Sequence, residues 1–211
     1  MATSPLCSLF EPEPPKSLRR RYLKRRAHKR TRPALRALPA KLSHAQAIHQ
    51  LIESYTHDGT LLRRSYSEIC QNIHTFTVVE DQANQFIGCA SLHVYGPHLA
   101  EIRSIVVRPG AGGRGAGSLL VQSLLQQAER AGIRCACLLT RIPGFFERFH
   151  FRVAEHHLLR DKVQKDCQYC SKRNACDEIA MVIGELPAPN DAPAIESIRY
   201  PQQGGLVQLQ L

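Results

Sequence analysis

The stretch RPGAGGRGAGSLL, residues 108–120, decides the fold. It places five glycines within eight residues, directly after EIRSIVV (101–107), whose apolar and β-branched residues predict a buried strand. Directly after it, apolar residues recur at helical spacing as far as Gly132, which ends the predicted helix: Leu120, Val121, Leu124, Leu125 and Ala128. A strand, a glycine loop and a helix N-terminus make an anion site, because the first-turn N–H groups lack intrahelical partners. The alternative, a flexible linker, rarely separates two such well-patterned elements, so the stretch predicts a phosphate-binding loop.

Length and composition set limits on the class of protein. A chain of 211 residues with 43% hydrophobic residues predicts one domain with appendages. It has no apolar run near the roughly 20 residues that span a bilayer, and no secretory signal, so we expect a soluble cytoplasmic protein. Its eight cysteines are then expected to be reduced thiols or metal ligands.

The positive charge is concentrated in one segment. Residues 1–40 hold 11 Lys/Arg and 2 Asp/Glu, so +9 of the net +10 lies there, chiefly in KSLRRRYLKRRAHKRTR (16–32). Such a run favours non-specific contact with polyanions such as nucleic acid, ribosomes or anionic lipid. A transit peptide and an extension without a specific partner are the other interpretations. We therefore expect a basic tail at 1–33, a folded domain at 34–186 and an extended, proline-punctuated segment at 187–211.

The remaining pattern predicts alternating helices and strands. Helices are expected at 43–55, with Ser43 as N-cap, and after residue 61, where Ser65 and Glu68 have the spacing of a capping box. Further strands are expected at 74–80, 85–95, 134–140 and 178–186, with a short helix at 144–149. The hairpin of the first two strands excludes a purely parallel sheet. The prediction is an α/β fold with a mixed, mostly antiparallel sheet flanked by helices.

Two other phosphate-binding motifs fit the sequence poorly. GAGGRG (110–115) matches GxGxxG, but the dinucleotide fingerprint requires an acidic residue about 20 positions later, where this chain has IRCACLL. No Gly-Lys-Ser/Thr follows, so a Walker loop is also excluded.

The segment VVRPGAGGRGAG (106–117) resembles the V-x-P-x-x-[QR]-x-x-G-x-[GA] signature of the GNAT acetyltransferases, with Pro109, Gly115 and Gly117 in place. The resemblance implies the GNAT acyl-CoA N-acyltransferase fold over 34–186 and acetyl-CoA as co-substrate. It implies that the backbone of Ile105, Val106 and Val107 pairs with the pantetheine arm. The pyrophosphate is then expected on the amides of Gly112, Gly113, Arg114, Gly115, Ala116 and Gly117. Gly112 occupies the Gln/Arg position, a departure for which Arg114 and the additional glycine amides can compensate.

Four segments resemble the acetyltransferase domain of the N-acetylglutamate synthases: LLRRS (61–65), IGCASLHVY (87–95), EIRSIVVRP (101–109) and LLTRIPGFFERFHF (138–151). In the last, a residue is missing after LTR and His150 replaces a glycine. The resemblance implies a short, stand-alone enzyme that acetylates the α-amine of L-glutamate in arginine biosynthesis. The implied acceptor-binding residues are Arg64, Ser65 and Arg141, with Cys89 lining the site through its backbone. Planar guanidinium suits carboxylates, which favours the arginines, although most arginines are solvated surface residues.

Acetyl transfer requires a neutral, aligned amine, so a general base is expected. Glu101, at the start of the strand before the glycine loop, is the candidate; the alternative is an ordinary strand-end carboxylate. Phe146 occupies the position of the tyrosine with which many GNAT enzymes protonate the departing thiolate. A thiol with a pKa of about 8.5 leaves acceptably as thiolate without it.

The segment DCQYCSKRNACDE (166–178) holds Cys167, Cys170 and Cys176 in a CxxCx5C array. A structural zinc loop lacking a local fourth ligand, a redox dithiol and plain reduced cysteines all remain open, and none is assigned to catalysis.

Two alternatives to glutamate acetylation remain. The chain can acetylate another small amine or a protein amine, or it can be a nucleic-acid- or ribosome-associated binding protein with a degenerate acetyltransferase core. The sequence leaves the oligomeric state open, with a dimer as one option.

Overall fold

The computed structural model describes residues 34–170 and 172–187. The predicted basic tail, 1–33, and residues 188–211 lie outside this part. Its strands are β1 (Arg36–Pro39), β2 (Phe76–Glu80), β3 (Phe86–Gly96), β4 (Leu99–Val107), β5 (Cys135–Thr140), β6 (Arg152–Val153) and β7 (Ile179–Gly184). Its α-helices are α2 (Ala45–Glu53), α3 (Tyr66–Gln71), α4 (Ala116–Arg130), α5 (Pro143–Glu147) and α6 (Arg160–Lys165). Short 3-10 turns are η1 (Leu42–His44), η2 (Ile73–Thr75), η3 (His156–Leu158), η4 (Cys167–Tyr169) and η5 (Arg173–Ala175).

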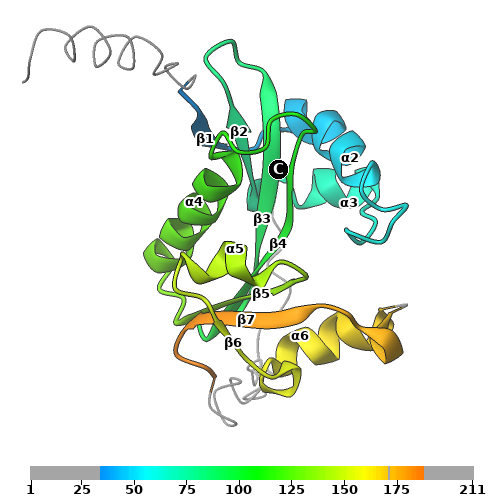
Figure 1. Ribbon diagram of the computed structural model, residues 1–211, viewed down its shortest axis with the longest axis vertical. Coiled ribbons are helices and arrows are strands. Elements are labelled where there is room, and N and C mark those ends of the chain that lie inside the picture. Colours follow the sequence, from blue (N-terminus) through cyan, green and yellow to red (C-terminus); the bar gives the residue numbers. More distant parts are fainter. Residues whose placement is uncertain (1–33, 171, 188–211) are drawn as a thin grey trace, which may run out of the picture. The chain divides into compact units, whose positions relative to one another are not determined.

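The strands described form one sheet in the order β1-β2-β3-β4-β5-β7-β6 (Figure 1). All neighbours are antiparallel except β4 and β5, which are parallel. The predicted mixed, mostly antiparallel α/β fold is confirmed.

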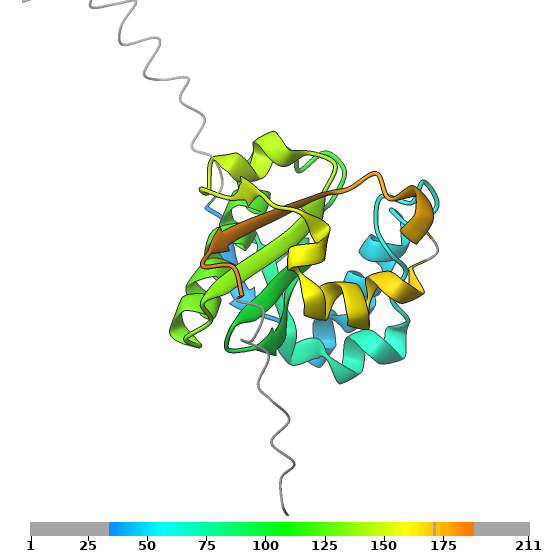
Figure 2. The ribbon, with the colours of Figure 1, turned by 90° about the horizontal axis from the view of Figure 1, so that it is seen from below.

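Helices cover both faces of this sheet (Figure 2). Val79 and Ala90 pack with the apolar residues of α4, whereas their neighbours Val78 and Cys89 pack with α2 and α3. Successive residues of a strand point to opposite faces of the sheet. A strand that is apolar throughout therefore contributes side chains to the hydrophobic core on each face.

The decisive stretch folds as predicted, into strand, glycine loop and helix. Helix α4 buries Leu120, Val121, Leu124 and Ala128. It ends at Gly132, whose φ of 69° and backbone bonds complete a Schellman motif: Gly132 N–H donates to Glu129 and Ile133 N–H to Ala128.

Some local expectations require correction. Ser43 lies within η1, and the N-cap of α2 is His44, whose side chain makes no capping bond. Ser65 does cap α3, since its Oγ accepts from Glu68 N–H at 3.1 Å. The sequence also gave no indication of β1, β6 or α6. No helix among the described residues is long and apolar enough to cross a membrane.

Candidate active site

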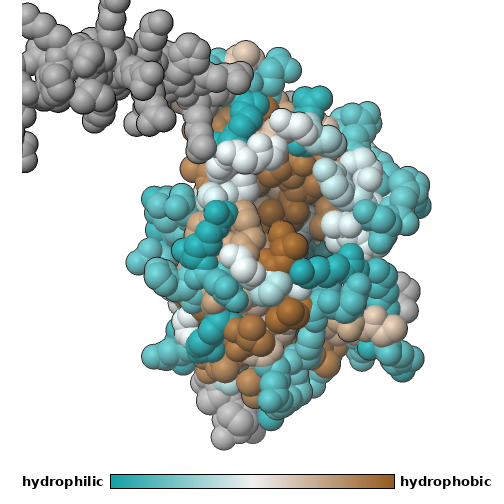
Figure 3. All heavy atoms as spheres, viewed as in Figure 1, coloured by the Kyte–Doolittle hydropathy of each residue, from teal (hydrophilic) through white to brown (hydrophobic). Residues whose placement is uncertain are grey.

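The sheet opens at its centre, where β4 and β5 separate. They pair only at Ala100–Ala136 and Glu101–Cys137. Beyond this point a cavity of about 510 Å³ lies between them, lined by 102–107 of β4 and 138–142 at the end of β5 and beyond. In the view of Figure 1, Figure 3 shows apolar side chains gathered in a hollow with hydrophilic residues around it. We call this cavity the cleft.

A bulge in β4 helps to form the cleft. Pairing with β3 shifts by one residue between Cys89–Val106 and Ser91–Arg103, so β4 carries an extra residue there. Ser104, within the bulge, has a φ of 54°, which is uncommon for a residue other than glycine. Bulges bend a strand and interrupt its hydrogen-bond ladder. The predicted cofactor strand, Ile105 to Val107, therefore lines the cleft immediately after an interruption.

The glycine loop continues from this strand to α4. Gly113 and Gly115 have φ values of 72° and 93°. No backbone N–H from Gly112 to Ser118 donates a hydrogen bond to another described residue. A Cβ added at Gly112, Gly113 or Gly115 would meet no atom within 4 Å, so the space beside these amides is open. Unpaired amides at the N-terminus of a fifteen-residue helix suit an anionic phosphate group.

The members of the predicted cofactor set differ in position. Ile105, Val106, Val107 and Gly117 line the cleft. Gly112, Gly113 and Gly115 are exposed, Arg114 is half-buried, and Ala116 is buried. Some of the predicted cofactor residues thus form a wall of the cleft, and the others form the open glycine loop beside it.

A second, smaller cavity of about 80 Å³ shares a wall with the cleft, and we call it the acceptor pocket. Thr60, Leu61, Ile102, Arg103, Ser104, Leu139 and Glu178 line both cavities. Arg64, predicted from the sequence, lines the pocket but not the cleft.

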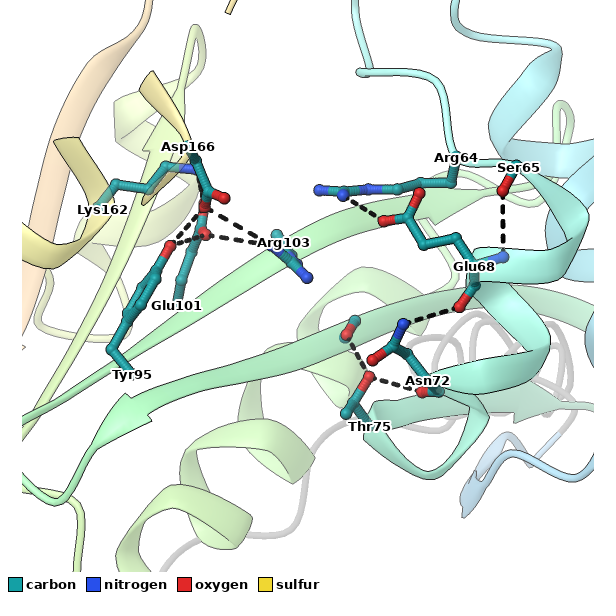
Figure 4. Close-up of polar contacts among 11 residues, drawn as sticks. Arg64, Ser65, Glu68, Asn72, Thr75, Tyr95, Glu101, Arg103, Lys162 and Asp166 are labelled. Carbon is teal, nitrogen blue, oxygen red and sulfur yellow. Dashed lines mark hydrogen bonds and ion pairs between the residues drawn. The ribbon is translucent and has the colours of Figure 1, made fainter. Parts of the chain in front are cut away.

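Arg64 and Arg103 reach this region from the start of α3 and from β4 (Figure 4). Arg64 Nη1 lies 2.6 Å from Glu68 Oε1. Arg103 Nη1 lies 3.7 Å from Asp166 Oδ2 and 4.0 Å from Glu101 Oε2, beyond ordinary hydrogen-bond length. Their side chains are 19% and 16% exposed. Arg103 was not singled out in the sequence, because nothing in the strand pattern distinguishes it from a solvated arginine.

Glu101, the predicted base, belongs to a buried ion network. Its Oε1 lies 2.8 Å from Lys162 Nζ, and its Oε2 accepts a hydrogen bond from the Tyr95 hydroxyl at 2.9 Å. Lys162 also contacts Asp166 at 3.1 Å, and the Tyr95 hydroxyl shares its single proton between Glu101 and Asp166, whose Oδ2 lies 2.6 Å away. Both oxygens of Glu101 are thus already paired.

Burial and charge fix the protonation of this network. Burial opposes the charge on Lys162, yet Glu101 and Asp166 raise its pKa above the ordinary value. Burial alone would raise the pKa of Asp166, but Tyr95 and Lys162 lower it. Burial and the two carboxylates raise the pKa of Tyr95, which keeps its hydroxyl as a donor. The network is therefore a structural support as well as part of the pocket wall.

Arg141, predicted to bind the acceptor, lines the cleft but not the acceptor pocket, and its guanidinium is already engaged. Its Nε lies 2.8 Å from Asp177 Oδ2, and its Nη2 donates to Asp177 Oδ1 and to the Gly59 carbonyl, each at 3.0 Å. The hydrogen bond to Asp177 raises the pKa of Arg141.

Two other predicted acceptor residues have local structural roles. The Ser65 hydroxyl caps α3 and is exposed. Cys89 is fully buried in β3, and burial raises the pKa of its thiol. Its partner in the ladder is Val106. Cys89 thus lies behind the cleft wall.

The structure bears on the three interpretations of the cysteine segment that the sequence left open. No three His, Cys, Asp or Glu side chains within 34–170 and 172–187 are grouped to hold a metal. Cys167 and Cys170 border the turn η4, whereas Cys176 follows η5 and is exposed. The three thiols therefore lie at two separate turns and do not form a cluster. Burial raises the pKa of Cys167, which disfavours the thiolate that redox chemistry needs.

Comparisons with known proteins agree with this geometry. A model of the acetyltransferase (GNAT) family matches residues 45–151. An uncharacterized N-acetyltransferase of Chlorobaculum tepidum is 38% identical over 143 residues, 68% of this chain and 92% of that protein. An amino-acid acetyltransferase of Mycobacterium tuberculosis is 33% identical over 126 residues, 59% of this chain and 71% of that protein.

Solved structures show the same fold. A Mycobacterium tuberculosis protein in complex with CoA and NLQ superposes with a TM-score of 0.63 at 27% identity, covering 73% of this chain and all of that one (100%). The N-acetylglutamate synthase from Neisseria gonorrhoeae superposes with a TM-score of 0.64 at 24% identity, over 72% of this chain and 35% of that chain. At this identity, the similarity to the Neisseria gonorrhoeae enzyme concerns the fold alone.

Proposed function

Because the chain belongs to the GNAT acetyltransferase family and is an acetyl-CoA-dependent N-acetyltransferase, we propose that its acceptor is an amino acid with two carboxylates, L-glutamate first among them. The relative named amino-acid acetyltransferase supports an amino-acid acceptor. Formation of N-acetylglutamate would place the chain in arginine biosynthesis, as the resemblance to the synthases implies.

The co-substrate fits the cleft and the glycine loop. The open, unpaired amides from Gly112 to Gly117 would hold the pyrophosphate, and Ile105 to Val107 would line the pantetheine arm. When bound, acetyl-CoA supplies an activated acetyl group as a thioester. The apolar walls around Ile102, Leu138 and Phe146 exclude water from that group.

The observation that carries the acceptor assignment is the convergence of Arg64 and Arg103 on the acceptor pocket (Figure 4). Guanidinium binds carboxylate with two parallel hydrogen bonds, and two such groups match the two carboxylates of glutamate. Glu101 in the same wall is paired with Lys162 at 2.8 Å, and Arg64 is paired with Glu68 at 2.6 Å, a contact that an acceptor carboxylate would share or replace.

The shared wall between pocket and cleft explains how the reactants meet. An acceptor held by Arg64 and Arg103 presents its amine next to Ser104, at the bulge that opens β4 toward the cleft. Holding the two substrates in this alignment lowers the activation free energy, because much of their translational and rotational entropy is already lost on binding. The remaining task is removal of a proton from the ammonium.

The test is steady-state kinetics of Arg64→Ala and Arg103→Ala with glutamate. Loss of a hydrogen bond to a charged group costs about 1.5–3 kcal/mol, so we expect the KM for glutamate to rise about 10- to 150-fold. For Arg64→Ala the KM for acetyl-CoA should change less than about twofold, since Arg64 lines neither the cleft nor the glycine loop. Arg130→Ala, at an exposed position of α4, is the matched control. Unchanged KM values for glutamate in both pocket variants would remove the basis for a dicarboxylate acceptor.

A further inference from the structure

Glu178 is a carboxylate in the wall shared by the two cavities, and it has no role in the site described so far. It immediately precedes β7, in the cysteine segment, and lines both the cleft and the acceptor pocket. Among the described residues its side chain has no hydrogen-bond or ion-pair partner, in contrast to Glu101. A half-buried carboxylate without a partner, on the wall that both substrates share, requires an explanation.

We propose that Glu178 accepts the proton that the acceptor ammonium must lose before it attacks the thioester. The proposal rests on the proposed function, since it concerns the same pocket. It assigns a purpose to the Asp-Glu end of the cysteine segment, which neither the metal nor the redox interpretation explains.

Two contacts fix the position of Glu178. The preceding residue, Asp177, forms the two-pronged pair with Arg141, which also donates to the Gly59 carbonyl. The following residue, Ile179, pairs with Thr140 in the sheet. The backbone at Glu178 is thus held between an ion pair and a strand, while its carboxylate stays without a partner. Arg141, predicted to bind the acceptor, positions this segment in the structure.

The charges around Glu178 are mixed. Burial raises its pKa most strongly; Arg141 and Lys162 lower it, while Asp177 and Glu101 raise it. The net pKa lies above its ordinary value, which makes the carboxylate a stronger base. Lys162 is committed to Glu101 at 2.8 Å and Arg141 to Asp177 at 2.8 Å, so neither cation neutralises Glu178 directly.

The proton and bond changes balance without a further reactant. One proton passes from the acceptor nitrogen to a carboxylate oxygen of Glu178, and the freed electron pair forms the new C–N bond. The C–S bond breaks, its electron pair remains on sulfur, and the second nitrogen proton passes to that thiolate. Glu178 then returns its proton to water.

The test compares Glu178→Gln with wild type, using whichever acceptor amine the wild type acetylates best. General base catalysis contributes at least about 100-fold, so kcat/KM at pH 7 should fall by about that factor. The deficit should shrink as pH rises, because free amine then replaces the missing base. The dissociation constant for CoA, measured by calorimetry, should change less than about twofold, because Glu178→Gln keeps the size of the side chain in the cleft wall and leaves the glycine loop unchanged.

Two further variants separate chemistry from structure. Glu185→Gln makes the same change at an exposed site just beyond β7 and should behave as wild type. Glu178→Asp keeps a carboxylate and should recover part of the rate, with the pH dependence of the wild type.

Three results would overturn the proposal: a wild-type pH profile in Glu178→Gln, a loss independent of pH, or a loss accompanied by weakened CoA binding. If the wild type prefers an amine with one carboxylate, the proposed dicarboxylate acceptor is wrong. The role of Glu178 is then still tested, because Glu178→Gln is assayed with that preferred amine. A wild type that acetylates no amine contradicts both.

Discussion

Lys162 and Glu101 form a buried ion pair: Nζ lies 2.8 Å from Oε1, and the side chains are 8% and 5% exposed. The pair joins α6 to β4, the strand that lines both the cleft and the acceptor pocket. Tyr95 and Asp166 complete the network from β3 and from the end of α6. The wall of the acceptor pocket is thus held by electrostatics as well as by packing.

Lys162→Met should therefore destabilise the protein. Removing one partner of a buried pair leaves the other charge uncompensated, at a cost of about 3–5 kcal/mol. Urea denaturation should show this loss. The double variant Lys162→Met/Glu101→Gln removes both charges and should lose less than Lys162→Met alone. A single variant as stable as wild type would contradict a buried, charged pair.

The network also predicts how stability changes with pH. The pKa of Asp166 is lower in the folded protein than its ordinary value of 3.8, so the unfolded chain binds the proton more readily. The stabilisation is present above that value and is lost as pH falls below about 4 toward the folded pKa. Asp166→Asn should consequently lose less unfolding free energy between pH 5 and pH 3 than wild type, measured in urea. An identical acid dependence of the two proteins would exclude this contribution.

The raised pKa of Lys162 leads us to expect that stability falls as pH rises in the alkaline range. Its pKa is raised in the folded protein above the ordinary value of 10.5, so its stabilisation is complete below that value and is lost as pH rises beyond it. Lys162→Met should therefore show a flatter alkaline stability profile than wild type. The same urea titrations, extended above pH 10, measure it; a loss of equal steepness in both proteins would contradict the assignment.

Gly115 and Gly112 form a matched pair in the glycine loop. Gly115 has a φ of 93°, so Gly115→Ala should cost about 1–2 kcal/mol of stability through backbone strain. Gly112 has no such constraint, and its Cβ would meet no atom within 4 Å, so Gly112→Ala should stay within about 0.5 kcal/mol. Thermal unfolding of both variants measures the difference. Equal stabilities would contradict the left-handed loop conformation.

Gly112→Arg tests the departure from the family signature. A guanidinium at this position can add a charge-assisted bond to the pyrophosphate, worth about 1.5 kcal/mol or roughly tenfold in affinity. Calorimetry should show tighter CoA binding. Gln126→Arg adds the same charge at an exposed position of α4 and should not reproduce the gain. Unchanged or weaker binding in Gly112→Arg would mean that the pyrophosphate does not lie near residue 112.

The strand, glycine loop and helix α4 were predictable because their signals are local. Periodic apolar residues, a cluster of glycines and the glycine that follows the helix, Gly132, each determine the conformation of residues only a few positions away in the chain. The Ser65 cap was predictable for the same reason. Strand β1 and helix α6 were not, because each is short and is held by distant partners: β1 by β2, and α6 through Lys162 by Glu101.

The site was predictable only where residues lie in a recognisable segment. Arg64 and Ile105 to Val107, which line the two cavities, were singled out in this way, whereas Arg103 and Glu178, which line them too, were not. Their place in the cavity walls arises from long-range geometry, since Glu178 reaches the pocket only because β7 pairs with β5. One signal was available, the Asp-Glu pair after Cys176, but the zinc, redox and plain-thiol interpretations of that segment concerned its cysteines alone.

The most direct measurement is acetyl-CoA-dependent thiol release by the purified chain with glutamate, glutamine, aspartate, lysine and a polyamine as acceptors. The Arg64–Arg103 pocket predicts the highest kcat/KM for glutamate, and at least about tenfold less for glutamine, which lacks the second carboxylate. A kcat/KM for glutamine or lysine equal to or above that for glutamate would contradict the account.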